Sequence, residues 1–202
     1  MRRVVKPLLW LVGLGPITYL VYQAFFGDLT ADPVKYITHF TGRTALITLF
    51  VTLAVSPLRR ATGWNWLIRV RRLVGLFSFF YAVIHLAIYL VFDRGFVFTE
   101  LGEDIVKRPF ITVGFSAWLM LLTLAVTSPQ AMIRRLGGTR WRALHRLVYV
   151  AAVAGVVHFT WAQKKDIREP LIFAGVLCLL LLPRLLPDRR AGSKRLAAVE
   201  SR

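Results

Sequence analysis

From Arg69 to Phe92 the chain reads RVRRLVGLFSFFYAVIHLAIYLVF: three arginines, followed by twenty residues (73–92) in which His85 is the only basic or acidic side chain. At 1.5 Å per residue, a helix of about twenty apolar residues crosses the ~30 Å hydrocarbon core of a bilayer. This stretch therefore predicts a membrane-spanning helix with a basic end and one histidine deep inside it.

Five similar apolar stretches accompany it. The six lie near residues 8–26, 40–58, 73–92, 110–128, 145–162 and 171–186. Of the 202 residues 56% are hydrophobic and 18% charged, whereas soluble domains average about 45–50% and about 25%. The composition excludes a disordered chain, a disulfide scaffold (Cys178 is the one cysteine) and a soluble nucleic-acid binder. We predict an all-α membrane protein, a bundle of six transmembrane helices.

The charges are distributed unequally between the two sides of this bundle. If the chain alternates across the bilayer, one side receives 19 Lys/Arg and two acids, and the other 7 Lys/Arg and eight acids. The positive-inside rule then places both termini in the cytoplasm. No A-x-A cleavage site follows the first apolar stretch, which we interpret as a retained helix. We expect residues 1–187 to form a single domain and residues 188–202 a disordered, basic cytoplasmic tail.

The four histidines all lie in or beside apolar stretches, where an ionisable side chain is costly and usually functional. His85 follows Arg72 by 13 residues, and His158 follows His145 by 13. Because both helices run outward from a basic end, His85 and His158 share one depth in the outer half of the membrane. Facing imidazoles on two helices typically hold a b-type haem iron. A hydrogen bond between helices is the alternative for any single histidine.

The remaining candidates lie nearer the two membrane surfaces. His145 is close to the cytoplasmic side, where the matching positions on the third helix are Arg71 and Arg72. A second haem there would lack an evident partner histidine, and the two arginines are candidates to bind an entry-side cofactor or quinol. His145 and His158 are about 140° out of phase on a straight helix. His39 and Arg43, four residues apart, share a face at the outer edge and suit a propionate, a quinone carbonyl or a docking partner, or simple snorkelling of the arginine.

Other chemistries find little support in the sequence. There is no H-E-x-x-H, cysteine pair, G-x-S-x-G, P-loop or G-x-G-x-x-G, so zinc catalysis, acyl transfer and nucleotide binding in a domain of this chain are disfavoured. A transporter or proton channel would need carboxylates along the helices, yet every Asp and Glu falls in a predicted loop or tail.

Several motifs resemble a known family, in order and at comparable spacing over about residues 28–175. They are Ala31–Lys35 (ADPVK), His39–Leu46 (HFTGRTAL), Arg69–Leu76 (RVRRLVGL), Tyr81–Tyr89 around His85, Thr127–Met132 (TSPQAM) and Trp141–Tyr149 around His145. The chain resembles the haem-binding membrane subunits of the bacterial methionine sulfoxide reductase system, the MsrQ or YedZ family of the ferric-reductase-like superfamily.

This resemblance implies a six-helix electron carrier of the bacterial inner membrane with His85 and His158 as axial ligands of haem b. It implies that His145 matches a further haem-associated histidine. It also implies a periplasmic molybdopterin-containing methionine sulfoxide reductase as partner. Electrons would come from the quinol pool or a cytosolic flavin reductase, with FMN as a further cofactor in some members. The alternative is a stand-alone haem-dependent metal or quinone reductase.

Overall fold

The computed structural model describes residues 2–27, 29–93, 95, 98–163 and 166–185, and every regular element within them is helical. The elements are α1 (Arg2–Phe26), α2 (Pro33–Thr62), α3 (Leu67–Ile88), the π-helix η1 (Tyr89–Asp93), α4 (Phe98–Lys107), α5 (Pro109–Val126), α6 (Gln130–Leu136), α7 (Gly138–Leu144), α8 (Leu147–Ala162) and α9 (Arg168–Leu185). The predicted disordered tail, residues 188–202, lies outside the described residues.

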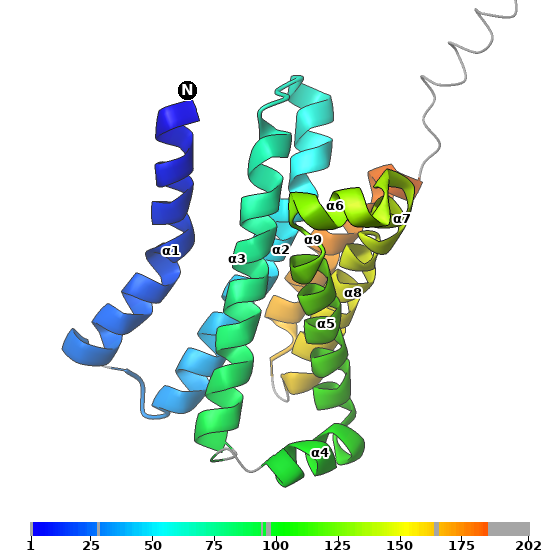
Figure 1. The fold of residues 1–202 in the computed structure, drawn as a ribbon. Coiled ribbons are helices and arrows are strands. Elements are labelled where there is room, and N and C mark those ends of the chain that lie inside the picture. The colour runs from blue at the N-terminus through cyan, green and yellow to red at the C-terminus, as the bar shows by residue number, and fades with distance from the viewer. Residues whose placement is uncertain (1, 28, 94, 96–97, 164–165, 186–202) are drawn as a thin grey trace, which may run out of the picture.

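The long helices run alternately up and down the bundle, and α4 lies across one end (Figure 1). The start of α1, the α2–α3 turn, α6, α7 and the end of α9 gather at the opposite end. We call the latter the basic end, because it carries Arg59, Arg60, Arg71, Arg134 and Arg142, and the former the mixed-charge end. The start of α1 and the end of α9 therefore lie on the same side of the molecule.

Within the described residues, five helical segments are long and apolar enough to cross a membrane, judged by length and composition. They are Val5–Phe26, Pro33–Thr62, Leu67–Phe92, Pro109–Val126 and Gly138–Ala162. The sixth predicted stretch forms α9, whose 18 residues include Arg168, Glu169 and Arg184. The chain is thus an all-helical, multi-pass membrane protein. A sixth span and cytoplasmic termini stay predictions.

Local sequence explains where the principal helices start and stop. The Asp32 carboxylate accepts a hydrogen bond from the Lys35 backbone N–H (3.1 Å), and Pro33 follows at the first helical position of α2. Gly63 ends α2 in the left-handed conformation (φ 73°), which favours glycine. Pro109 opens α5 in the same way as Pro33 opens α2.

The core is built by two tightly packed helix pairs, α2 with α3 and α5 with α8, with α9 closing one side. Leu53 of α2 and Ala152 of α8 are completely buried where the pairs meet. Many large apolar side chains point outward, including Leu11, Phe25 and Leu179, each more than 70% exposed. This distribution is expected where lipid, rather than water, surrounds the bundle.

Helix α1 is mostly exposed and is held through Tyr81 of α3. The Tyr81 hydroxyl donates to the Gly13 carbonyl (2.6 Å) and accepts from the Ile17 N–H (3.3 Å). These backbone groups would bond each other in a regular helix, but Pro16 lies within that turn. The hydroxyl of Tyr81, itself fully buried, bridges the opened turn. Gly13 permits the contact, because a Cβ there would lie 2.3 Å from the Phe77 ring.

Tyr81→Phe is therefore expected to loosen α1 without removing the core of the bundle. Two backbone groups would lose their partner, at a cost of about 1–3 kcal/mol. Thermal unfolding in detergent and hydrogen exchange at α1 measure this loss. The control is Tyr22→Phe, which alters an exposed tyrosine of α1 itself. Equal stability of the two variants would contradict the bridging role.

Three details differ from the sequence-based prediction. The fifth apolar stretch, 145–162, is not one helix with its basic flank, because α7 ends at Leu144 and α8 begins at Leu147. His145 lies in the turn between them, so the phase calculated for one straight helix does not apply. The third stretch changes to a π-helix at Tyr89, and the following loop contains the amphipathic helix α4.

Candidate functional site

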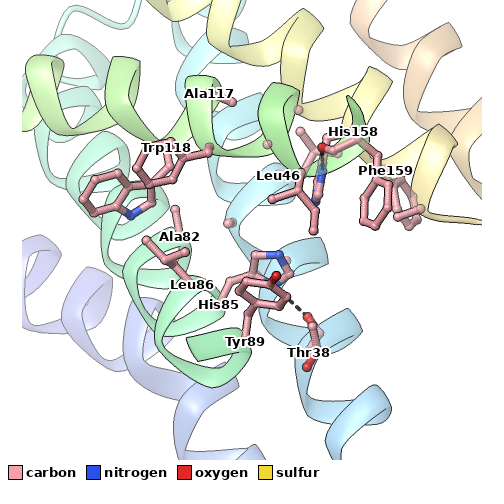
Figure 2. A pocket seen from close by; sticks show the side chains of 18 of the residues that line it. Thr38, Leu46, Ala82, His85, Leu86, Tyr89, Ala117, Trp118, His158 and Phe159 are labelled. Atoms are coloured by element: carbon pink, nitrogen blue, oxygen red, sulfur yellow. Dashed lines mark hydrogen bonds between the residues drawn. The ribbon is translucent and has the colours of Figure 1, made fainter. Parts of the chain in front are cut away.

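A cavity of about 500 Å³ lies between α2, α3, α5 and α8, toward the mixed-charge end. Its walls are mainly apolar and aromatic, with Leu46, Trp118 and Phe159 among the side chains that line it (Figure 2). Cavities of this size and character are typical of ligand-binding sites. The few polar side chains in these walls are therefore the candidates to bind a cofactor.

His85 of α3 and His158 of α8 point toward one another across this cavity (Figure 2). Their ring centroids are 6.1 Å apart and their planes are nearly perpendicular, at 78°. The two residues are 73 positions apart in the sequence, and it is the packing of the helix pairs that brings them together.

The hydrogen bonds of the two histidines define which nitrogen is free. Nδ1 of His85 lies 3.0 Å from the Thr38 carbonyl oxygen, and Nδ1 of His158 lies 2.7 Å from that of Phe110. A carbonyl oxygen can only accept, so each Nδ1 carries the hydrogen and each neutral ring has its lone pair on Nε2. Metal-binding histidines are oriented in this way, with the second nitrogen donating to a carbonyl or carboxylate.

A glycine on the neighbouring helix makes room for each ring. A Cβ on Gly42 would lie 2.9 Å from Cε1 of His85, and a Cβ on Gly114 would lie 2.5 Å from Nδ1 of His158. Both distances are shorter than real Cβ contacts, so any side chain at these positions displaces its histidine.

The two halves of the site use the same local arrangement. In each, the carbonyl that accepts from the histidine lies four residues before the glycine: Thr38 before Gly42 on α2, and Phe110 before Gly114 on α5. A short sequence likeness accompanies it, Leu53–Pro57 (LAVSP) and Leu124–Pro129 (LAVTSP). The second copy contains one additional residue, Thr127, and the sequences on either side of the two copies differ, so the likeness is difficult to find from the sequence alone.

The residues present fit a haem held by two imidazoles. Imidazole nitrogens bind transition metals at about 2.0–2.1 Å, and each ring centre lies about 1 Å behind its nitrogen, so two rings sharing one metal have centroids about 6 Å apart. The observed 6.1 Å agrees. In addition, the Trp118 indole N–H is buried at the cavity without a hydrogen-bond partner in the described part of the chain. A ligand with acceptor atoms would satisfy it.

The outer rim of the cavity contains His39 and Arg43. Arg43 forms a two-pronged ion pair with Glu169 of α9, with Nε 2.7 Å from Oε1 and Nη2 2.8 Å from Oε2. Such a fork geometry fixes the guanidinium strongly, so this arginine ties α2 to α9 as well as lining the cavity. The Nδ1 atom of His39 lies 3.5 Å from the Gln163 side-chain amide.

A second arginine at the rim, Arg108, was not singled out from the sequence. Its Nε lies 3.1 Å from Oδ1 of Asp104, an almost fully buried carboxylate that also accepts from the Tyr89 hydroxyl. Tyr89 and Arg108 both line the cavity. Arg108 directly precedes Pro109, and the sequence pattern there indicates only a turn. The sequence did offer one signal: Arg108 follows Asp104 by four residues, a spacing that places two side chains side by side on a helix.

His145 lies apart from the other three histidines, at the basic end. Its Nε2 is 3.2 Å from the Thr127 hydroxyl, and its ring stacks on Trp141 with centroids 4.0 Å apart. His158 follows His145 by 13 residues, which corresponds to about 20 Å at the rise of a helix. Arg71 is half-buried and donates to the Ser56 hydroxyl (3.3 Å), whereas its neighbour Arg72 is exposed. The structure therefore separates the two arginines that the sequence paired.

Comparison with known proteins identifies the family of this chain. The family of ferric reductase like transmembrane components matches residues 41–156, and the chain is a redox membrane subunit of that class. Relatives in Herminiimonas arsenicoxydans (48% identity, 90% of this chain and 84% of the relative), Ralstonia nicotianae (49%, 89% and 83%) and Rhodospirillum rubrum (50%, 89% and 88%) are each named protein-methionine-sulfoxide reductase heme-binding subunit MsrQ. The chain belongs to the MsrQ family.

Proposed function

We propose that this protein carries electrons through a haem b held by His85 and His158, and delivers them to a methionine sulfoxide reductase outside the cytoplasmic membrane. The observation that supports this most directly is the pair of facing imidazoles, each with Nδ1 bonded to a backbone carbonyl and Nε2 free. The relatives' name refers to haem binding and to methionine sulfoxide reductase. It does not identify the haem type, the donor or the acceptor.

The roles of the protein residues follow from the geometry. A bound haem supplies one-electron redox chemistry, while the protein sets its position and surroundings. The carbonyls of Thr38 and Phe110 orient the two imidazoles and increase their basicity. The apolar walls around Leu46 and Phe159 exclude water, which tunes the reduction potential. His39, Arg43 and Arg108 at the rim are placed to interact with acidic groups of the cofactor.

At the basic end, we assign His145, Arg71 and Arg72 to the entry of electrons. Arg71 lies close enough to His145 for an electrostatic interaction, and Trp141 stacks on the imidazole. The residues there could hold a second haem, FMN or a quinone. The donor would be the quinol pool or a cytosolic flavin reductase. Since Nε2 of His145 bonds to Thr127 rather than facing another imidazole, a second bis-histidine haem is not favoured.

We further propose that the protein resides in the bacterial inner membrane with its basic end in the cytoplasm. The arginines concentrated there agree with the positive-inside rule. The cavity then opens toward the periplasm, the side on which a molybdopterin-containing partner would accept electrons. The reduction of oxidised methionine takes place in that partner, and residues 1–187 act as a single membrane domain.

The test is a dithionite-reduced minus oxidised absorption spectrum of the purified protein, with haem stoichiometry by pyridine haemochromogen. A sharp low-spin b-type α band is expected, with one haem per chain if His85 and His158 form the only bis-histidine site. Two haems per chain would assign a second one to His145. Protein expressed with ample haem that shows a flat spectrum would contradict the proposal.

A kinetic experiment tests the acceptor. Reduced protein is expected to reoxidise when the purified periplasmic reductase and a methionine sulfoxide peptide are both present, and to remain reduced when either is omitted. Rapid reoxidation by a ferric chelate or a quinone alone would instead favour a stand-alone reductase.

A further inference from the structure

Arg184, near the end of α9, reaches across the bundle to the backbone of α2. Its Nη2 donates to the Leu53 carbonyl oxygen at 2.5 Å. That carbonyl lacks its usual helical donor, because the residue four positions later is Pro57, which has no N–H. Arg184 thus satisfies a backbone group that would otherwise be left unpaired inside the bundle, where this is costly.

Among the residues that the structure describes, no carboxylate pairs with the positive charge of Arg184. Its Nη1 is buried and has no hydrogen-bond partner among the residues that the structure describes. The guanidinium lies over the Tyr149 ring, 4.7 Å from its centroid, an interaction that stabilises a cation but does not neutralise it. Arginine stays protonated in proteins, so its buried charge can be neutralised only by an anion.

The neighbouring charges make this need stronger. Besides the Tyr149 ring, the side chains whose charge acts on Arg184 are those of Arg71 and Arg60, and both of these are positive. Every acidic residue within the described ranges lies toward the mixed-charge end, in a loop, in η1, in α4 or in the first turn of α9. Three positive side chains, from α2, α3 and α9, therefore act on one another at the basic end, and none of them pairs with a carboxylate of the described residues.

We propose that Arg184 Nη1, supported by Arg71 and Arg60, binds the phosphate of an anionic phospholipid in the leaflet at the basic end. Guanidinium groups are well suited to phosphate oxygens, and basic clusters between helices on the cytoplasmic side typically hold lipid headgroups. Arg184 is half-buried in the last turn of α9, so its side chain lies at the edge of the bundle at the basic end, where a headgroup in that leaflet can approach it. The inference is independent of the haem and of the proposed electron acceptor.

Native mass spectrometry of the full chain in detergent tests this site, with phosphatidylglycerol and phosphatidylcholine as probes. We expect one phosphatidylglycerol to bind in preference to phosphatidylcholine. Arg184→Gln is expected to weaken phosphatidylglycerol binding about tenfold or more, through the loss of a charge-assisted hydrogen bond. Arg134→Gln removes an exposed arginine at the same end and is the control, expected to stay within about threefold of the wild type.

Two further experiments identify the source of the anion. Inorganic phosphate or flavin mononucleotide at millimolar concentration should not displace the lipid, and displacement would overturn the lipid assignment. Asp188, outside the described residues, is the acidic residue nearest to Arg184 in sequence. If Asp188→Asn, and not lipid, changes the tryptophan-fluorescence melting temperature, an internal ion pair replaces the proposal.

The experiment remains decisive if Arg184→Gln does not fold. Arg184→Lys keeps the positive charge but loses the planar guanidinium with its fixed N–H donors, and is expected to bind phosphatidylglycerol with intermediate affinity. Melting in phosphatidylcholine separates the bond to Leu53, which should destabilise the variants in any lipid, from the headgroup contact, which should not. Equal affinity of the wild-type protein for the two lipids would refute the site whatever the variants do.

Discussion

Replacing His85 or His158 with alanine is expected to remove nearly all haem from the cavity between the helix pairs. Each imidazole would supply one of two axial bonds, and the cavity walls are otherwise apolar. The remaining histidine cannot replace the missing one, because its own ring is fixed by the bond to Thr38 or Phe110. Haem per chain by pyridine haemochromogen, together with the reduced α band, measures the loss.

The control for these variants is His39→Ala, which removes a histidine from the rim of the same cavity. Most of the haem is expected to remain, since this ring is beside Gln163 rather than facing another imidazole. Added imidazole should restore part of the low-spin spectrum to His85→Ala by entering the vacated space. Full haem retention in either axial variant would refute the assignment of the ligands.

The second large effect is expected from one added methyl group, in Gly114→Ala. The new Cβ would lie 2.5 Å from Nδ1 of His158 and 2.7 Å from its Cε1. The ring must then move, and its bond to the Phe110 carbonyl breaks with it. Overpacking of this kind typically costs about 1–3 kcal/mol, and here it also displaces Nε2 from the facing imidazole. We expect loss of most haem and a lower melting temperature.

Two other glycines provide a graded comparison. Gly42→Ala meets His85 less closely, at 2.9 Å from Cε1, and should cause a smaller loss of haem. Gly175→Ala on α9 meets nothing within 4 Å and should be neutral or slightly stabilising, because alanine is the better helix former. The expected order of damage is Gly114, Gly42, Gly175. Equal haem content in all three variants would show that the glycines do not position the histidines.

Much of the helical framework was accessible from the sequence, because solvent preference is a property of each segment. Runs of apolar residues long enough to cross a bilayer predicted the positions of α1, α2, α3, α5 and α8. The sixth run coincides with α9, which carries three charges, so its span stays a prediction. The break at His145 was missed, since nothing between Leu144 and Leu147 is a helix breaker; neither glycine nor proline occurs there.

The sequence alone determined that this chain belongs in lipid, and that His85 and His158 lie at one depth. Both follow from counting along the chain, because helical rise and hydrophobicity are local quantities. Only the tertiary structure decided that the centroids of the two rings lie 6.1 Å apart and that the carbonyls of Thr38 and Phe110 fix their tautomers. It also decided that Arg184 donates to the Leu53 carbonyl, which Pro57 leaves without a helical donor. Backbone carbonyls are present at every residue and carry no sequence signature. Which of them meets a given side chain depends on how the helices pack.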